Sequence, residues 1–262
     1  SYFIAMELIR GATLRWVIDN ANAVRRPVPL QHALHIASDI LSGLHYAHER
    51  TDDDGTPLKL VHRDISPVNI LISRSGIAKL CDFGVAKSEM QRVMTRAGIV
   101  KGKFRYMAPE QLNAETVDRR ADCFSVGAVL WEILVGRRLF DHGSEDDVVA
   151  AIRAGDYPAP SDFRPGLPRA VDRVVRRSLH PNRDRRYRSA RELQLGCEEI
   201  LRLLPQASNS VLVGEYVSAE LDGTAGLGVP TRKRQYTPEN DSLVASGFEA
   251  LDPPVPSSPT TI

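Results

Sequence analysis

The sequence predicts a mainly α-helical domain with a small β-hairpin, followed by a disordered tail. Three observations support this fold class. Apolar residues recur at helical spacing in several segments, two short apolar runs flank a Ser- and Gly-containing turn, and the end of the chain is rich in Ser, Gly, Thr and Pro. With 262 residues, 42% of them hydrophobic and 26% charged, the chain is long enough for one substantial core.

The start of the chain is predicted to be a buried strand that leads through a short linker into a helix. Residues 2–8, YFIAMEL, are apolar and partly β-branched or aromatic, as buried strands are. Over residues 12–24, Leu14 and Ile18 fall on one face of a helix, and the prolines that follow end it.

The middle of the chain contains the clearest helix and the hairpin. From Leu30 to His48 the apolar residues recur at alternating intervals of four and three, which predicts a helix with one side against a core. Residues 50–59 contain Asp, Gly and Pro and are predicted to form a surface loop. Residues 69–72 and 77–81 read as two strands of a hairpin, and after them the periodicity is lost until Pro109.

The remaining segments are helical up to the tail. Further helices are predicted at 121–136, 144–154, 168–179 and 189–203. Beyond Pro205 large apolar residues become scarce, so residues 206–262 are expected to be disordered.

Charge and cysteine content exclude several classes of protein. The formal net charge is +1, so the overall charge does not attract the chain to nucleic acid or to a membrane surface. Cys81, Cys123 and Cys197 are far apart and odd in number, which argues against a disulfide framework and a zinc site. No apolar stretch approaches the length of a membrane span, and we expect a cytoplasmic protein.

Three oxygen-bearing side chains next to the predicted hairpin point to phosphoryl transfer. That reaction needs a group that orients the attacking hydroxyl and accepts its proton, together with ligands for Mg²⁺. Asp64 can act as the base, and Asn69 and Asp82 supply the oxygen atoms that hard cations prefer. All three lie on the two loops at the ends of the hairpin.

These residues belong to motifs that resemble those of the protein kinase family, in its bacterial Ser/Thr style. HRDISPVN (62–69), DFG (82–84) and APE (108–110) follow one another in the family's order. The resemblance covers residues 1–205 and implies a kinase-like fold: residues 1–11 would be the last small-lobe strand and the hinge, and residues 12–205 the large C-terminal lobe.

The resemblance also implies a reaction and its site. The enzyme would transfer the γ-phosphoryl group of ATP to Ser or Thr hydroxyls of a protein substrate, with Mg²⁺ as cofactor. Asp64 would be the catalytic base, Asn69 and Asp82 the metal ligands, and Arg63 the partner of a phosphorylated residue in the segment after Asp82. Thr95 is the preferred candidate for that phosphorylation, ahead of Ser88.

Further residues take family roles in nucleotide binding and in support of the site. Met6 resembles the gatekeeper, Glu7 to Ile9 the hinge that meets adenine, and Leu71 the apolar floor below it. Similarly, Asp122 would bind the backbone of the catalytic loop, and Arg186 would pair with Glu110.

The chain departs from the family pattern at two positions beside the catalytic Asp. Ser66 stands where Ser/Thr kinases usually carry Lys, and Lys103 stands where they usually carry Thr. We hypothesise that the cation and the hydroxyl have exchanged loops, so that Lys103 supplies the positive charge near the transferred phosphate.

The Gly-rich loop and the Lys of the family's small lobe have no match in this sequence. GTAGLG (223–228) has its glycines in the wrong order, follows no strand and reads as a linker. The missing small lobe would be required for normal ATP binding. We therefore keep two alternatives: a non-catalytic regulatory fragment, and a small-molecule phosphotransferase, against which the segment GKFRYMAPEQL (102–112) argues.

Other motifs favour plain structural explanations. DDDG (52–55) would need Glu at position 63 for a calcium loop, but Arg63 stands there. The pairs His32/His35 and His45/His48 lack further metal ligands at matching positions. TRKRQY (231–236) is interpreted as a solvated charge run.

Overall fold

Helix α5, Arg120–Val135, forms the centre of the fold in the computed structural model, which describes residues 6–83, 103–141 and 143–224. Its residues from Ala121 to Leu134 are all buried, as expected for a helix that is apolar on every side. The helix ends at Gly136, which has a φ of 82°. Glycine takes this left-handed conformation without steric cost and commonly ends helices.

The sheet has three short antiparallel strands in the order β1-β2-β3. They are β1 (Gly11–Thr13), β2 (Ile70–Ser73) and β3 (Ala78–Leu80). Strands β2 and β3 form the predicted hairpin, in which Leu71 faces Lys79 across the ladder. Strand β1, which pairs with β2, was not predicted, because three residues are too few to show the alternation that identifies a strand.

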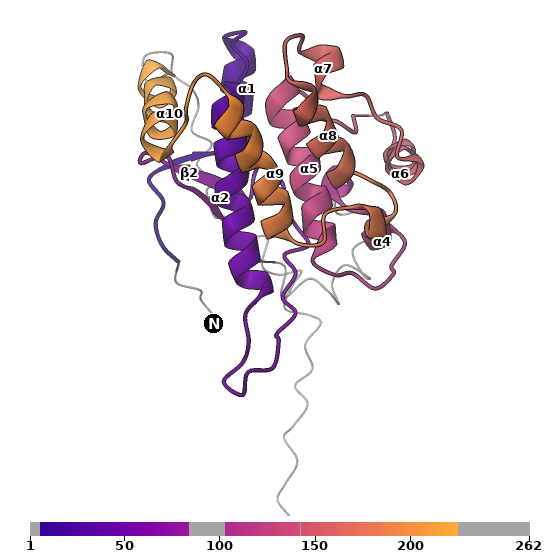
Figure 1. Cartoon of the computed structure of the whole chain (residues 1–262). Helices are drawn as coiled ribbons and strands as arrows, with labels where there is room; N and C mark the ends of the chain where they lie inside the picture. The colour runs from indigo at the N-terminus through magenta and orange to yellow at the C-terminus, as the bar shows by residue number, and fades with distance from the viewer. Residues whose placement is uncertain (1–5, 84–102, 142, 225–262) are drawn as a thin grey trace, which may run out of the picture. The chain divides into compact units, whose positions relative to one another are not determined.

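The first two helices agree with the prediction. Helix α1 spans Leu14–Ala23, and the Oγ1 atom of Thr13 accepts a hydrogen bond from the backbone N–H of Trp16 at 3.1 Å, which caps its start. Helix α2 spans Leu30–His48 as predicted and packs against α5 and α9 (Figure 1).

The later helices also follow their predicted ranges. They are α6 (Glu145–Ala154), α8 (Arg169–Ser178) and α9 (Ala190–Leu203). Two short elements precede α5, η2 (Lys103–Tyr106) and α4 (Pro109–Leu112), and two lie between the later helices, α7 (Pro160–Phe163) and η3 (Arg183–Arg185). Helix α9 contacts α2, α5 and α8, and in Figure 1 it lies between α2 and α5. The predicted mainly α-helical, kinase-like fold is confirmed.

The predicted start of the disordered tail at residue 206 is wrong. Residues Ser210–Thr224 form helix α10, which contacts α1, α2, β1 and β2. Its side chains Val213 and Val217 are 0% exposed and belong to the main core. These two valines are four residues apart and so share one helix face, a spacing that the overall scarcity of large apolar residues obscured. Residues 225–262 of the predicted tail lie outside the described residues.

The prediction of a buried strand at residues 2–8 is not supported where it can be followed. Residues 2–5 lie outside the described part, residues 6–8 are not in a strand, and Met6 is 71% exposed. Among the described residues, a backbone hydrogen bond to the sheet is made only after this segment, at Arg10, whose carbonyl accepts from the Arg74 N–H at 2.8 Å. The described elements therefore do not enclose Met6, contrary to the expectation of a core residue.

Among the helices that the structure describes, none is long and apolar enough to cross a membrane.

The burial of α10 predicts that its core side chains stabilise the whole domain. Replacing Val217 by Ala should lower the free energy of unfolding by about 2 kcal/mol, because it removes buried methyl groups and leaves a cavity. Chemical denaturation measures this change. The control is Val211→Ala on the same helix, where the side chain is 61% exposed and the expected change is below about 0.5 kcal/mol. Equal effects of the two substitutions would contradict the burial of α10.

Candidate active site

The catalytic loop, residues 61–69, is held by one buried carboxylate from helix α5. The Asp122 side chain is 0% exposed. Its Oδ2 accepts a hydrogen bond from the His62 backbone N–H at 2.8 Å, and its Oδ1 accepts one from the Arg63 N–H at 2.9 Å. His48 of α2 donates from Nε2 to Oδ2, also at 2.8 Å. The predicted role of Asp122 is thus confirmed, and three donors compensate the buried charge.

The imidazole of His62 joins the catalytic loop to the loop after β3. Its Nε2 lies 3.1 Å from the Cys81 carbonyl oxygen, which can only accept, so the nitrogen carries the proton. Its Nδ1 accepts from the Asp64 N–H at 3.3 Å. Burial lowers the pKa of His62, although the Asp122 carboxylate opposes this effect. A neutral His62 with the proton on Nε2 is the tautomer that satisfies both bonds.

Hydrogen bonds to backbone atoms connect the loops that carry the three predicted catalytic residues at the open end of the hairpin. The Cys81 N–H donates to the Asn69 carbonyl at 3.0 Å, and the Asn69 side-chain amide donates to the Asp64 carbonyl at 2.7 Å. Asp82 follows Cys81 directly. The pKa of the Cys81 thiol is raised first by burial, then by the Asp82 carboxylate, and further by Asp64. The Asp82 carboxylate oxygen Oδ2 lies 3.8 Å from this sulfur atom.

Two of these motif residues have an unusual backbone conformation. Arg63 has a φ of 64° and Asp82 a φ of 59°, in the left-handed region that residues other than glycine avoid. Each such residue costs on the order of 1–3 kcal/mol, and such residues concentrate at functional sites. The hydrogen bonds of Asp122 compensate this cost at Arg63.

The donor set fits magnesium bound to a nucleotide. Asn69 uses its amide nitrogen to bind Asp64, which leaves its Oδ1 as the atom able to face a cation. No group of three or more His, Cys, Asp or Glu side chains that could hold a metal ion occurs among the described residues. One amide oxygen and the Asp82 carboxylate suit Mg²⁺, which takes few protein ligands and completes its shell with phosphate oxygens and water.

The two positions that depart from the family pattern are only partly described. Ser66 is half-buried in the catalytic loop, and its carbonyl accepts from the Asn69 N–H at 3.0 Å. Lys103 begins η2, but its side chain lies outside the described part of the chain. The same holds for Ser88 and Thr95, so the exchange of loops and the phosphorylation remain predictions.

The residues expected around adenine lie along the sheet. Leu71 is half-buried, and it faces the side of β2 opposite to the fully buried Ile70 and Ile72. The Lys79 ammonium, directly across from Leu71, pairs with both Glu7 carboxylate oxygens at 2.7 and 2.6 Å. The predicted hinge residue Glu7 therefore lies next to the predicted floor, with the half-buried Ile9 following it.

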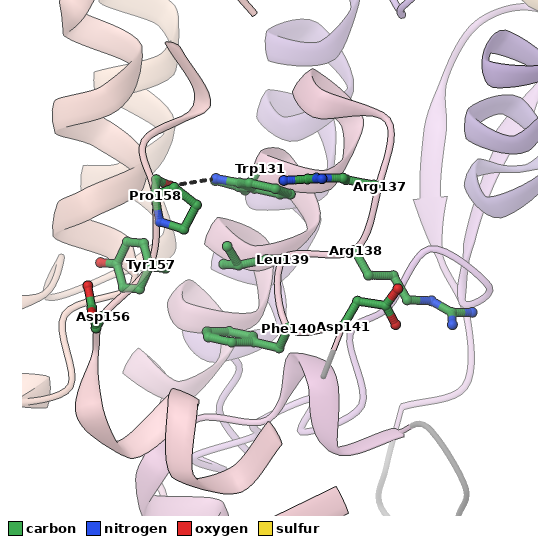
Figure 2. A pocket seen from close by; sticks show the side chains of 9 residues that line it. All are labelled: Trp131, Arg137, Arg138, Leu139, Phe140, Asp141, Asp156, Tyr157 and Pro158. Atoms are coloured by element: carbon green, nitrogen blue, oxygen red, sulfur yellow. Dashed lines mark hydrogen bonds between the residues drawn. The ribbon is translucent and has the colours of Figure 1, made fainter. Parts of the chain in front are cut away.

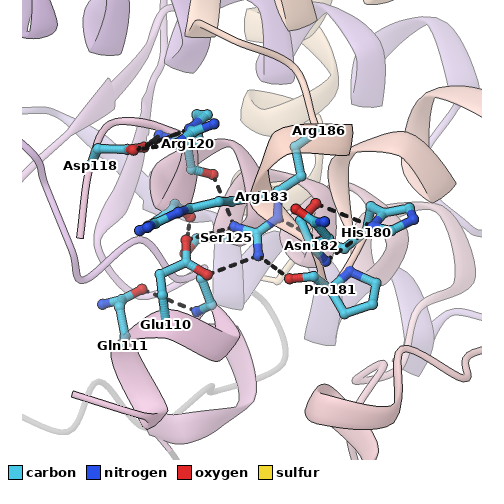
Figure 3. A network of polar contacts seen from close by, with 12 residues as sticks. Glu110, Gln111, Asp118, Arg120, Ser125, His180, Pro181, Asn182, Arg183 and Arg186 are labelled. Atoms are coloured by element: carbon cyan, nitrogen blue, oxygen red, sulfur yellow. Dashed lines mark hydrogen bonds and ion pairs between the residues drawn. The ribbon is translucent and has the colours of Figure 1, made fainter. Parts of the chain in front are cut away.

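The predicted pair of Arg186 and Glu110 is confirmed as a buried bidentate ion pair. The two Arg186 Nη atoms lie 2.7 and 2.8 Å from the Glu110 oxygens, and further bonds reach the carbonyls of His180 and Pro181. Figure 3 shows the guanidinium group between the carboxylate and these carbonyls. The pair joins α4 to the loop before α9.

A second buried cluster, which the sequence analysis missed, supports the segment before α4. The carboxylate of Glu132, fully buried on α5, accepts from Arg15 Nη2 and from the Tyr106 hydroxyl, each at 2.6 Å. The pKa of Tyr106 is raised by burial and then by Glu132. Ser125 Oγ also donates to the Tyr106 carbonyl at 2.6 Å. The sequence did contain a signal for this cluster: Glu132 lies inside the apolar run CFSVGAVLWEILVG, and a buried charge requires partners.

A separate pocket of about 310 Å³ lies at the other end of α5 (Figure 2). Trp131 lines it and donates from Nε1 to the Pro158 carbonyl at 2.9 Å. Arg137 lies over the Phe163 ring at 3.8 Å. None of the predicted catalytic residues lines this pocket. Trp131 is nine residues from Asp122 along the helix, about 14 Å.

Comparison with known proteins agrees with the fold and the motifs. The model of the protein kinase domain matches residues 1–195. The chain is 37% identical over 216 residues to the tyrosine-protein kinase MasK of Myxococcus xanthus, which covers 82% of this chain and 33% of MasK. It is 32% identical over 261 residues to the serine/threonine-protein kinase PknH of Mycobacterium bovis, a match that covers 94% of this chain and 42% of PknH. For the serine/threonine-protein kinase PknB of Mycobacterium leprae the identity is 32% over 245 residues, a match that covers 92% of this chain and 38% of PknB.

These matches show that the chain belongs to the protein kinase family and resembles its bacterial members. The chain spans between 33% and 42% of the length of these three relatives.

Loss of the Arg186 guanidinium should strongly destabilise the domain. We expect Arg186→Ala to lower the free energy of unfolding by about 3–5 kcal/mol, because Glu110 would stay buried without its counter-ion. Thermal and chemical denaturation measure the change. Arg185→Ala is the matched control, since Arg185 is the exposed neighbour and its loss should cost less than about 0.5 kcal/mol. A small effect at Arg186 would show that the pair does not support the fold.

Proposed function

We propose that this chain carries the catalytic machinery of a Ser/Thr protein kinase that transfers the γ-phosphoryl group of ATP. The observation that supports the proposal is the pair of hydrogen bonds, from the Asn69 amide to the Asp64 carbonyl and from the Cys81 N–H to the Asn69 carbonyl, that join the loops carrying Asp64, Asn69 and Asp82. Such a kinase uses cellular ATP, so we also propose a cytoplasmic location and a protein substrate.

In the proposed reaction the chain's own residues position and deprotonate the acceptor. The Asp64 carboxylate orients the substrate hydroxyl and takes its proton as the oxygen bonds to the γ-phosphorus and the bond to the ADP oxygen breaks. Asn69 Oδ1 and the Asp82 carboxylate would hold magnesium, which, when bound, neutralises charge on the phosphate oxygens. Asp122 keeps the loop backbone in place during these changes, because its bonds do not involve the reacting atoms.

The motif style supports Ser/Thr as the acceptor class. The segment MAPEQL (107–112) fits the bacterial Ser/Thr kinases better than the tyrosine kinases, and the catalytic loop HRDISPVN lacks the Ala-rich sequence of the latter. Two of the relatives compared above are named Ser/Thr kinases and one a tyrosine kinase. Phosphoamino acid analysis of a protein substrate treated with the full-length protein decides between these acceptors, and small-molecule acceptors test the phosphotransferase alternative.

The role of Asp64 predicts a large loss of turnover when its basicity is removed. In the full-length protein, Asp64→Asn should lower kcat about 10³-fold while nucleotide binding is retained, because the general base is lost but the metal ligands remain. Steady-state kinetics and nucleotide titration measure the two effects. Asp53→Asn, in the exposed loop 50–59, serves as the control and should leave kcat unchanged. Full turnover in Asp64→Asn would show that Asp64 is not the catalytic base, whereas a lack of turnover in the unmodified protein would favour the non-catalytic alternative.

The exchange of residues between loops predicts a rescue. Lys103→Thr should lower kcat about 100-fold, because it removes a positive charge from the developing transition state. Adding Ser66→Lys to that variant should restore most of the activity by returning the cation from the catalytic loop. If Lys103→Thr turns over normally and Ser66→Lys is inactive, the two positions do not exchange roles.

A further inference from the structure

Helix α10 contacts the β2-β3 hairpin at the turn opposite the catalytic end. The closest approach involves two glycines, Gly76 in the turn and Gly214 in the helix. A Cβ atom added to Gly214 would lie 2.5 Å from the Arg74 carbonyl oxygen and 2.9 Å from the Gly76 nitrogen. A Cβ at Gly76 would clash with the backbone of Ser210 and Gly214. The helix and the turn thus meet backbone to backbone, a fit that a side chain at either glycine would prevent.

Apolar burial, rather than charge, holds this contact together. Val213 and Val217 are fully buried in α10, which contacts β1 and β2 as well as α1 and α2. Arg74 and Asp222 pair at 2.9 Å, but their side chains are 50% and 66% exposed, and exposed pairs contribute little. A hydrogen bond from Asn20 of α1 to Glu220 adds a second attachment.

Continuous hydrogen bonding connects the turn to the proposed metal ligands. At the turn, the Gly76 N–H donates to the Ser73 carbonyl at 2.8 Å and the Ser73 N–H to the Ile77 carbonyl at 3.0 Å. The two strands follow, and at the other end the Cys81 N–H donates to the Asn69 carbonyl. The strands are paired over this length, about 13 Å, so we expect a displacement of the turn to reach the open end.

We propose that α10 is a positioning element for the active site. Through Gly214 it fixes the β2-β3 hairpin, so that Asn69 and Asp82 keep the spacing that a magnesium-bound nucleotide requires. This role rests on the proposed function, in which these two residues are the metal ligands. A purely structural clamp would stabilise the fold without affecting the ligand spacing.

The test compares the same substitution at two glycines of one helix in the full-length protein. Gly214→Ala introduces the clash, whereas Gly223→Ala adds a Cβ that meets nothing within 4 Å. Alanine is the better helix former at both positions, so the control removes that effect. Two quantities are measured: amide hydrogen exchange at Cys81 in the metal-free protein, and the Mg²⁺ concentration that gives half-maximal activity.

We expect Gly214→Ala to accelerate exchange at Cys81 and to raise the half-maximal Mg²⁺ concentration, each about tenfold, with Gly223→Ala unchanged. The KM for the protein substrate should stay the same. Unchanged exchange and unchanged Mg²⁺ dependence in folded Gly214→Ala would overturn the proposal, because a clamp alone would change only the melting temperature. If Gly214→Ala does not fold, Val217→Ala replaces it, because this substitution loosens α10 without a clash. The same two quantities are then measured for Val217→Ala.

A further variant separates this inference from the proposed function. Asp82→Asn should raise the half-maximal Mg²⁺ concentration whatever α10 does, because it removes a ligand charge. If Asp82→Asn has this effect and Gly214→Ala does not, only the positioning role fails. If Asp82→Asn leaves the Mg²⁺ dependence unchanged, the assignment of the metal ligands fails, and the hydrogen exchange at Cys81 then decides whether α10 still controls the hairpin.

Discussion

The buried carboxylate of Asp122 is the constraint on which the site depends. It satisfies two backbone N–H groups of the catalytic loop and the imidazole of His48, so that one side chain joins α5, α2 and the loop. Because the loop has no regular secondary structure, its backbone donors need partners from elsewhere. Arg63, with its positive φ, keeps its strained conformation next to this anchor.

Hydrogen bonds of neutral side chains extend from the Asp122 contacts to the rest of the site. His62 bonds with one ring nitrogen to the Asp64 N–H and with the other to the Cys81 carbonyl, which sets the distance between the loops on either side of the hairpin. Asn69 continues the same chain of contacts. The charged groups proposed to do chemistry are thereby left at the end of the network, where a substrate and a metal ion can engage them.

Helix α5 connects this site to the segment that precedes α4. Asp122 at its start holds the catalytic loop, and Glu132, ten residues further along, binds Arg15 and Tyr106. The ion pair of Arg186 with Glu110 secures the segment that follows Tyr106. Buried charges of this kind cost desolvation energy, and they are tolerated because each has several short hydrogen bonds.

The sequence by itself determined the main helices and the hairpin and supplied the candidates for catalytic residues, because periodicity and contiguous motifs are local signals. It also predicted the partners of Asp122 and Arg186, but only through the resemblance to kinases. Tertiary structure alone decided the rest. Strand β1 exists because β2 offers it a hydrogen-bonding edge, α10 is ordered because Val213 and Val217 find a core to enter, and Glu132 is stabilised by residues distant in sequence. Tertiary structure also decided the exposure of Met6, because burial depends on which elements cover a side chain and not on the side chain alone.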